Sequence, residues 1–241
     1  MKKLLKCLKK RKHIVFFDFE GTQHSQEMIA IGAVLCTLNR KGRIEKMRPP
    51  FKIYVKAKNQ VGKYVVNLTG ITDKMLAEKG VSFLEAMNQF KKYCGLYWKR
   101  SLFVSFGNHD IRILNQSISY NLNAPKELCH QIHTNYFDFA TFISTFIKDQ
   151  NGCMMSLVHY CELFGVETHQ PNHDPEADAI NLALLYDKFL EDKALVTEEY
   201  KKVLGNTRKV PEPIHVVMKL LSEGKTVTPE DFEQIVKEDL E

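Results

Sequence analysis

The chain has 241 residues, of which 44% are hydrophobic, enough for one sizeable domain with additions. No apolar run approaches the roughly 20 residues that a membrane-spanning helix needs, which argues against a membrane protein. The six cysteines are scattered and include no C-x-x-C pair. This usage predicts reduced thiols in a cytoplasmic chain, rather than a disulfide framework or a zinc cluster.

Basic residues are concentrated at the start of the chain. Seven of the 34 lysines and arginines lie in residues 1–12, where there is no acidic residue, so the formal net charge of +5 arises in this segment. A basic arm of this kind can bind phosphate groups, and it can equally be a solvated terminus. Both interpretations stay open. The segment lacks an apolar stretch and is a poor match to a secretory signal.

Three short strands are predicted in the first quarter of the chain. The β-branched and aromatic run at 13–17 indicates a buried strand, and the apolar run at 29–38 indicates a second. Residues 51–57 alternate between apolar and polar side chains, as a strand with one solvent-exposed face does. Because a turn with a glycine at 39–42 follows the second strand, we expect an antiparallel hairpin here.

Strands and helices alternate further along the chain. A helix is expected at 82–94, where Ser82 and Glu85 have capping-box spacing and Gly95 ends the helix. The next expected elements are a strand at 101–107, a helix at 111–120, a strand at 135–139, a helix through Ile147, a helix at 156–165 and a helix from Asp174-Pro175. This order predicts a mixed α/β sheet with helices packed on it.

Two acidic residues stand one residue apart at the end of the first predicted strand. Residues two apart on a strand point to the same face, so the carboxylates of Asp18 and Glu20 are expected to lie together. Such carboxylates repel each other unless a cation lies between them, and oxygen ligands of this kind suit Mg²⁺ or Mn²⁺. Two acids in a solvated turn would give the same D-x-E pattern.

Further candidate residues follow at the ends of later elements. Asp110 comes soon after the strand predicted at 101–107, where a lone aspartate is usually a helix N-cap. His173 precedes the helix that begins at Pro175, and Asp178 lies in its first turns, where the helix dipole favours an acid. Each residue alone has a structural explanation. Together they form an ordered set: D-x-E, a strand-end Asp, and H-x-x-x-x-D on a late helix.

This ordered set resembles the motifs of the DEDDh 3′–5′ exonucleases, the DnaQ-like branch of the ribonuclease H-like superfamily. F-D-F-E-G-T (17–22) resembles their first motif, G-N-H-D (107–110) the second, and H-D-P-E-A-D-A (173–179) the third. L-T-G-I-T (68–72) and S-L-x-x-x-C-x-x-F-G-V (156–166) are also similar to segments of these enzymes. Spacing and detail look closest to the Eri1 and KapD-like exonucleases.

The resemblance covers about residues 13–192 and implies a fold for them. That fold is a ribonuclease H-like mixed sheet of five strands, three antiparallel and then two parallel, flanked by helices. The basic arm at 1–12 and a helical C-terminal extension at 193–241, with a linker near 205–213, lie outside the resemblance. Pro175 stands where related enzymes often carry a small residue, and proline suits the first turn of a helix.

Metal-dependent hydrolysis of nucleic acid is the activity that the resemblance implies. By the family pattern, Asp18, Glu20, Asp110 and Asp178 would hold two Mg²⁺ or Mn²⁺ ions. His173 would be the general base that takes a proton from the attacking water, since imidazole titrates near working pH. The products would be nucleoside 5′-monophosphates released from a 3′ end.

The resemblance also implies where the 3′ end of a substrate would bind. Its contacts would come from five residues: Gly21, Thr22, Leu68, Thr69 and Gly70. RNA or single-stranded nucleic acid is the expected substrate, with the Eri1-like similarity favouring RNA, and a DNA proofreading or repair exonuclease is the alternative. A non-catalytic nucleic-acid-binding adaptor of the same fold is a further alternative, although all five catalytic positions are filled. The sequence does not indicate whether the chain has a protein partner or which oligomeric state it adopts.

Other interpretations of these residues are weaker. The doublet His173-Asp174 also occurs in HD-type phosphohydrolases, but that fold is wholly helical, whereas strands are predicted here. His169 and His173 have the spacing of zinc ligands on a helix, but Pro171 between them disfavours a continuous helix. Asp138 is expected to cap the helix that follows it rather than to bind a metal.

Overall fold

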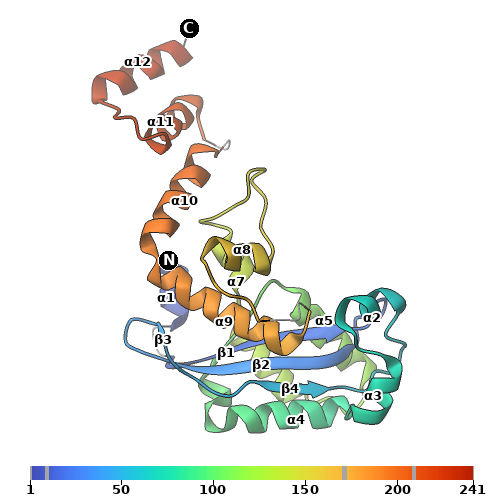
Figure 1. Cartoon of the computed structure of the whole chain (residues 1–241). Coiled ribbons are helices and arrows are strands. Elements are labelled where there is room, and N and C mark those ends of the chain that lie inside the picture. The colour runs from blue at the N-terminus through green and yellow to red at the C-terminus, as the bar shows by residue number, and fades with distance from the viewer. Residues whose placement is uncertain (1, 9–10, 170–172, 208–209, 241) are drawn as a thin grey trace. The chain divides into compact units, whose positions relative to one another are not determined.

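The computed structural model describes residues 2–8, 11–169, 173–207 and 210–240, which form two compact units (Figure 1). The first unit consists of the chain up to Ala140 together with Leu157–Glu191. The second consists of Thr141–Ser156 together with the chain from Asp192. The domain boundaries drawn from the sequence stay predictions. All candidate site residues belong to the first unit.

A mixed β-sheet forms the centre of the first unit. Its strands, within the described residues, are β1 (His13–Gly21), β2 (Met28–Leu38), β3 (Ile44–Met47), β4 (Phe51–Tyr54), β5 (Leu102–Ser105) and β6 (Tyr136–Asp138). Their order is β3-β2-β1-β5-β6, with β4 also paired to β2. The strands β1 to β4 pair antiparallel, whereas β5 pairs parallel to β1 and β6 parallel to β5. The predicted ribonuclease H-like α/β class is confirmed.

The described part of the sheet has six strands rather than five, because the third antiparallel strand is divided. β3 pairs with residues 36–38 of β2, and β4 pairs with residues 30–33. Pro49 and Pro50 lie between β3 and β4 and have no N–H to donate, so the ladder to β2 is interrupted there. The strand predicted at 51–57 corresponds to β4, and β3 was not predicted.

Helices cover both faces of this sheet (Figure 1). The helices of the first unit are α1 (Lys2–Leu8), α2 (Lys63–Thr69), α3 (Asp73–Lys79), α4 (Phe83–Cys94), the 3₁₀ helix η1 (Gly95–Arg100), α5 (His109–Tyr120), α6 (Lys126–Thr134), α8 (Leu157–Leu163) and α9 (Pro175–Glu191). Helix α7 (Phe139–Ile143) belongs partly to each unit. The helices expected at 82–94, 111–120 and 156–165 and from Pro175 are α4, α5, α8 and α9. The helix expected to reach Ile147 ends at Ile143, and α1, α2, α3 and α6 were not predicted.

The alternation of side chains along β1 decides which residues face which helices. Phe19 belongs to a buried cluster that includes side chains of α4, α5 and α6. Phe16 faces the other way, and its ring lies 5.2 Å from the ring of Tyr186 on α9. Because Asp18 and Glu20 share the direction of Phe16, both carboxylates lie on the α9 face of the sheet.

The basic N-terminal segment takes part in the fold of the first unit. Leu4 of α1 is buried. The guanidinium of Arg11 donates hydrogen bonds to the Ser101 carbonyl at 2.7 Å and to Oδ1 of Asn135 at 2.6 Å, directly before β5 and β6. Residues 9 and 10 lie outside the described residues. The phosphate-binding interpretation of this segment stays a prediction.

The second unit contains the helices α10 (Lys193–Gly205), α11 (Glu212–Ser222) and α12 (Pro229–Asp239). α10 and α11 pack closely, since a Cβ at Gly205 would lie within 3.0 Å of the Ser222 side chain. Thr228 and Asp231 form a capping box at the start of α12. The linker predicted at 205–213 includes residues 208 and 209, which lie outside the described residues.

Two global sequence predictions concern cysteines and membranes. The cysteines, all six of which fall within the described ranges, are free thiols. Across those same ranges, no helix is long and apolar enough to cross a bilayer.

Candidate active site

Three segments that are far apart in the sequence meet near the end of β1. Asp18 and Glu20 come from β1, Asp110 from the first turn of α5, His173 from the segment before α9, and Asp178 from the first turn of α9. Within the described residues, Glu20, His173 and Asp178 each present a ligand atom within 4.8 Å of the other two. The fold therefore brings the first and third sequence motifs into direct contact range.

Asp110 joins the second motif to the first. It is only 3% exposed, and its Oδ1 accepts a hydrogen bond from the Phe19 backbone N–H at 2.7 Å. Phe19 stands between Asp18 and Glu20, so this bond holds the first turn of α5 against the acidic end of β1. The sequence placed Asp110 at a strand end, and the structure places it in the first helical turn that follows β5. Asp110 is not one of the three residues, Glu20, His173 and Asp178, whose ligand atoms lie within 4.8 Å of one another.

His173 lies directly before α9 in an unusual backbone conformation. Its φ is 61°, a left-handed value that non-glycine residues rarely adopt. The side chain is exposed, yet it stays within reach of Glu20 and Asp178. Such conformations persist only where neighbouring structure enforces them, and they occur often at functional sites. An accessible imidazole therefore stands at the edge of the carboxylate cluster.

A glycine in β2 allows α9 to lie directly on the sheet beside these carboxylates. Gly32 pairs with Asp18 of β1 on one side and with Lys52 of β4 on the other. A Cβ at Gly32 would lie less than 3.0 Å from the backbone of Pro175 and from the backbone nitrogen of Glu176. Sequence analysis did not single out Gly32, although an isolated glycine within an apolar strand is a known signal of close backbone approach.

The carboxyl groups of this cluster bind protons more tightly than free carboxyl groups do. Burial, followed by the charge of Asp178, raises the pKa of Glu20 to about 8, and burial raises the pKa of Asp110 to about 7. Burial and the charge of Asp110 raise the pKa of Asp18 well above its usual range. Burial also raises the pKa of Asp178, although the charge of His173 opposes this. Burial and the mutual repulsion of these carboxylates therefore disfavour their charged forms.

This donor set fits a divalent metal ion. Carboxylate oxygens are the ligands that Mg²⁺ and Mn²⁺ prefer, and a bound cation would offset the burial and repulsion that raise these pKa values. Asp18, Glu20, Asp110 and Asp178 would supply the oxygens, since Asp18 and Glu20 lie on β1, Asp110 is bonded to Phe19 between them, and Asp178 lies within 4.8 Å of Glu20. Whether they bind two ions, with His173 as a base, stays a proposal.

The chain's sequence matches the Exonuclease family model, of the RNase T type, over residues 15–186. This chain belongs to that family. The matched segment begins within β1 and ends within α9, so the exonuclease domain contains every element that carries a candidate residue. A comparison with curated protein sequences gives no match.

Solved exonuclease structures share the fold of this exonuclease domain. The nuclease domain of 3′hExo, a DEDDh family member bound to rAMP, matches with a TM-score of 0.59 and 19% identity over 76% of this chain and 94% of that one. A 3′-exonuclease described in the 3′-end-specific recognition of a histone mRNA stem-loop has a TM-score of 0.61 and 17% identity, over 76% and 83%. E. coli exonuclease I in complex with a dA16 oligonucleotide has a TM-score of 0.58 and 15% identity, over 86% and 45%.

The fold predicted from the DEDDh resemblance is thereby confirmed for the exonuclease domain. A closer relationship to the Eri1 and KapD-like enzymes stays a prediction. The all-helical fold of the HD-type phosphohydrolases is ruled out by the sheet. The zinc-helix interpretation of His169 and His173 involves Pro171, which lies outside the described residues. Asp138 ends β6 directly before α7, at the position expected for a cap.

The loop after β1 is held by the hydroxyl of Thr22, a residue predicted to contact substrate. Thr22 is 2% exposed, and its Oγ1 accepts a hydrogen bond from the Glu27 N–H at 3.0 Å and lies 2.6 Å from Oγ of Ser25. The neighbouring Gln23 N–H donates to the Val61 carbonyl at 2.9 Å. The hydroxyl of Thr22 is therefore used within the loop, and this loop is tied to the segment that starts α2.

The predicted contacts Leu68, Thr69 and Gly70 form the end of α2. Gly70 ends the helix with a φ of 71°, and the Thr69 hydroxyl donates to the Val65 carbonyl at 2.8 Å. Leu68 is 38% exposed, and Tyr64, one turn earlier on the same helix, is 64% exposed. The exonuclease thus presents apolar side chains to solvent on the helix that adjoins the loop after Glu20.

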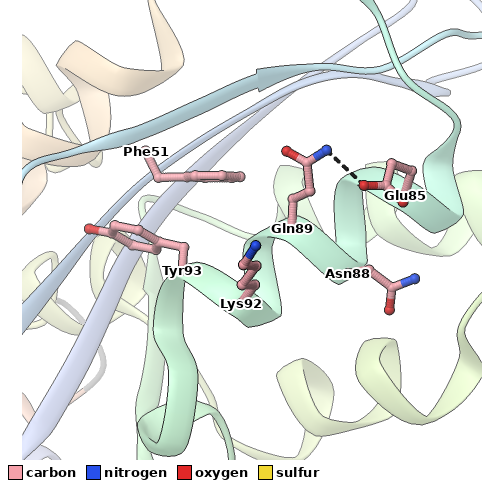
Figure 2. Close-up of a pocket in the computed structure, with 6 residues that line it drawn as sticks. All are labelled: Phe51, Glu85, Asn88, Gln89, Lys92 and Tyr93. Atoms are coloured by element: carbon pink, nitrogen blue, oxygen red, sulfur yellow. Dashed lines mark hydrogen bonds between the residues drawn. The ribbon is translucent and has the colours of Figure 1, made fainter.

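Figure 2 shows a pocket between β4 and α4, on the face of the sheet opposite to α9. It has a volume of about 680 Å³ and is lined by Phe51, Glu85, Asn88, Gln89, Lys92 and Tyr93. Phe51 and Lys52 are adjacent on the strand and point to opposite faces. The pocket therefore opens away from the carboxylate cluster and is separate from the candidate active site.

The raised pKa of Glu20 predicts how the stability of the metal-free exonuclease depends on pH. The folded state keeps the Glu20 proton up to about pH 8, whereas the unfolded chain releases it near 4.5. Because the folded state binds more protons in this window, the stabilisation that the Glu20 carboxyl contributes is greatest below pH 4.5 and falls as pH rises towards 8. Glu20→Gln should flatten this decline and raise Tm at pH 8 by several degrees, at about 2–4 °C per kcal/mol.

Thermal unfolding followed by circular dichroism in EDTA, between pH 5 and pH 8, measures this effect. Glu45→Gln on β3, an exposed site, is the control and should leave the pH dependence unchanged. Added Mn²⁺ should stabilise the wild type at pH 8 more than Glu20→Gln. A wild-type Tm that rises steadily from pH 5 to pH 8 in EDTA would contradict the prediction.

Proposed function

We propose that this chain is a DEDDh-type 3′–5′ exonuclease that hydrolyses the terminal phosphodiester bond of a nucleic acid and releases nucleoside 5′-monophosphates. The observation that carries the proposal is the convergence of Glu20, His173 and Asp178 within 4.8 Å, in a chain of the exonuclease family. Asp18 and Asp110 complete the five residues of the family pattern beside them.

The carboxylates would bind the metal ions, and His173 would move the proton. Asp18, Glu20, Asp110 and Asp178 would hold two Mg²⁺ or Mn²⁺ ions, which supply a water of lowered pKa and stabilise charge on the leaving oxygen when bound. His173 would accept the proton of the attacking water at a ring nitrogen. Its exposed side chain can release that proton to solvent after each turnover.

The substrate would be single-stranded RNA, bound by its 3′ end. The similar structures include a nuclease domain bound to rAMP and a 3′-exonuclease that recognises an mRNA stem-loop. Gly21 and Thr22 would shape the loop that contacts the last nucleotide, and Leu68, Thr69 and Gly70 would contact its base and sugar. A DNA exonuclease is the second candidate, because E. coli exonuclease I, solved with dA16, has the same fold.

Removal of the proposed base is expected to slow turnover without weakening metal binding. His173→Ala should lower kcat by about 10²–10⁴-fold, the usual contribution of general base catalysis. Mn²⁺ affinity should change little, since the four carboxylates remain. His169→Ala is the matched control and should retain wild-type kcat. Wild-type turnover by His173→Ala in a steady-state assay would refute the assignment of His173 as the base.

A degradation assay tests the proposed function itself. Single-stranded RNA and DNA, labelled at either the 5′ or the 3′ end, are incubated with the protein in Mg²⁺, Mn²⁺ or EDTA. We expect metal-dependent release of mononucleotides from the 3′ end, faster on RNA. Faster hydrolysis of DNA would favour the second candidate. If neither polymer is cleaved while the protein binds metal and nucleic acid, the chain is a binding module.

A further inference from the structure

Three residues form a row across the sheet beneath the start of α9. Asp18 of β1 pairs with Gly32 of β2, and Gly32 pairs with Lys52 of β4. Residues paired across strands point to the same face, so Lys52 projects to the side on which Asp18 and α9 lie. Pro175, at the start of α9, lies over the glycine between them. Lys52 is therefore placed at the opposite flank of α9 from the carboxylate Asp18.

Lys52 makes a specific ion pair with the residue that follows His173. Its Nζ donates to Oδ2 of Asp174, and both side chains are largely buried, at 24% and 22% exposed. The ammonium also lies 5.5 Å from the centroid of the Tyr54 ring. A partly buried pair with an additional ring contact is held more firmly than an exposed surface pair.

Asp174 uses its other groups to start α9. Its Oδ1 accepts a hydrogen bond from the Glu176 N–H at 2.9 Å, and its carbonyl accepts one from the Asp178 N–H at 2.9 Å. One carboxylate oxygen thus caps the helix that carries Asp178, and the other binds Lys52. The residue just before it, His173, has the left-handed φ of 61°. The sheet, the helix start and the histidine are linked through this one aspartate.

We propose that Lys52 is a positioning residue, which through its ion pair with Asp174 fixes His173 and the first turn of α9 against Asp18 and Glu20. The inference rests on the proposed function, since the geometry it maintains is that of the hydrolytic site. A displacement of about 1 Å in a catalytic group costs roughly 10²-fold in rate. Loss of the ion pair should therefore lower kcat by about 10- to 100-fold and leave KM within about threefold.

The test compares two substitutions of Lys52 with a control substitution that breaks a different ion pair to α9. Lys52→Met removes the charge and keeps the chain length, whereas Lys52→Arg keeps the charge. Further along α9, Arg43 binds Asp187 with two hydrogen bonds, at 2.7 and 2.6 Å, so Arg43→Met breaks a sheet-to-helix ion pair away from the site. The readouts are kcat, KM, Tm and amide hydrogen exchange of residues 173–178.

The expected results separate positioning from general stability. Lys52→Met should lower kcat and speed exchange at 173–178, and Lys52→Arg should restore most of both. Arg43→Met should lower Tm and leave kcat unchanged. Asp174→Asn, which keeps the capping oxygen, should match Lys52→Met, and the double variant should be no worse than either single variant.

Two results would overturn the inference. A rise in KM with wild-type kcat for Lys52→Met would show that Lys52 binds the substrate phosphate directly. Unchanged kcat and unchanged exchange at 173–178 would show that the ion pair positions nothing. If the wild type hydrolyses no polymer, the proposed function fails, but the exchange data still decide the inference: protection lost in Lys52→Met and kept in Arg43→Met supports it, and equal protection in both refutes it.

Discussion

Asp18→Asn is expected to abolish both high-affinity Mn²⁺ binding and turnover. The side chain keeps its size, but it loses the charge that faces Glu20, Asp110 and Asp178 across the cluster. We expect kcat/KM to fall at least about 10³-fold, equal to roughly 4 kcal/mol of lost transition-state stabilisation. Isothermal titration with Mn²⁺ and the labelled-RNA assay measure the two effects.

The control for Asp18→Asn is Glu176→Gln, which removes one negative charge from the first turn of α9 without removing a proposed ligand. It should keep Mn²⁺ affinity and kcat close to wild type. The metal-free Asp18→Asn protein should be at least as stable as the wild type, because a repelling buried carboxylate is gone. Wild-type Mn²⁺ affinity in Asp18→Asn would show that Asp18 is not a ligand.

Gly32→Ala is expected to be the most disruptive single-methyl change in the exonuclease domain. The added Cβ would collide with backbone atoms of Pro175 and Glu176, which cannot move aside as a flexible side chain can. Overpacking of this kind costs about 1–3 kcal/mol, and each kcal/mol lowers Tm by about 2–4 °C in a chain of this size. Because α9 carries Asp178 and follows His173, kcat should also fall roughly 10²-fold for a shift of about 1 Å.

Gly95→Ala provides the comparison. Gly95 has a φ of 58° at the end of α4, and among the described residues beyond its chain neighbours no atom lies within 4 Å of the position that its Cβ would take. With a ψ of −134°, this backbone lies in a region that is essentially restricted to glycine, so the change should cost about 1–3 kcal/mol through backbone strain alone and leave kcat unchanged. Scanning calorimetry and steady-state kinetics measure both variants. A Gly32→Ala protein with wild-type kcat would show that α9 can reach the carboxylates without close contact to β2.

The strands and the acidic motifs could be predicted because their signals are local. The β-branched and aromatic run before Asp18 marks β1, and the Ser82 hydroxyl accepts a hydrogen bond from the Glu85 N–H, as its spacing indicated. By contrast, α2 begins after Gly62 with no side-chain cap and contains two adjacent valines, which favour strands. The division of the third strand follows from Pro49 and Pro50, a signal that was present and not used.

The positioning elements of the site could not be predicted in the same way. Lys52 and Asp174 are 122 residues apart, and their ion pair exists only because β4 and the start of α9 flank the same glycine. A lysine on an alternating strand is normally a solvent-facing residue, so nothing local marks Lys52 as different from other lysines. Long-range contacts of this kind depend on sheet register and helix placement, which no local pattern encodes.

The row Asp18–Gly32–Lys52 also depends on the register in which β1 pairs with β2 across the short loop between them. That loop, residues 22–27, is closed by the Thr22 N–H bond to the Glu27 carbonyl at 2.9 Å. Surface loops usually tolerate insertions. An insertion here that shifted the register of β2 against β1 by one residue would turn Gly32 to the other face. It would place the side chain of Ile31 or Ala33 beneath the start of α9. The register between β1 and β2 therefore keeps Gly32 beneath α9 and maintains the geometry of the proposed site.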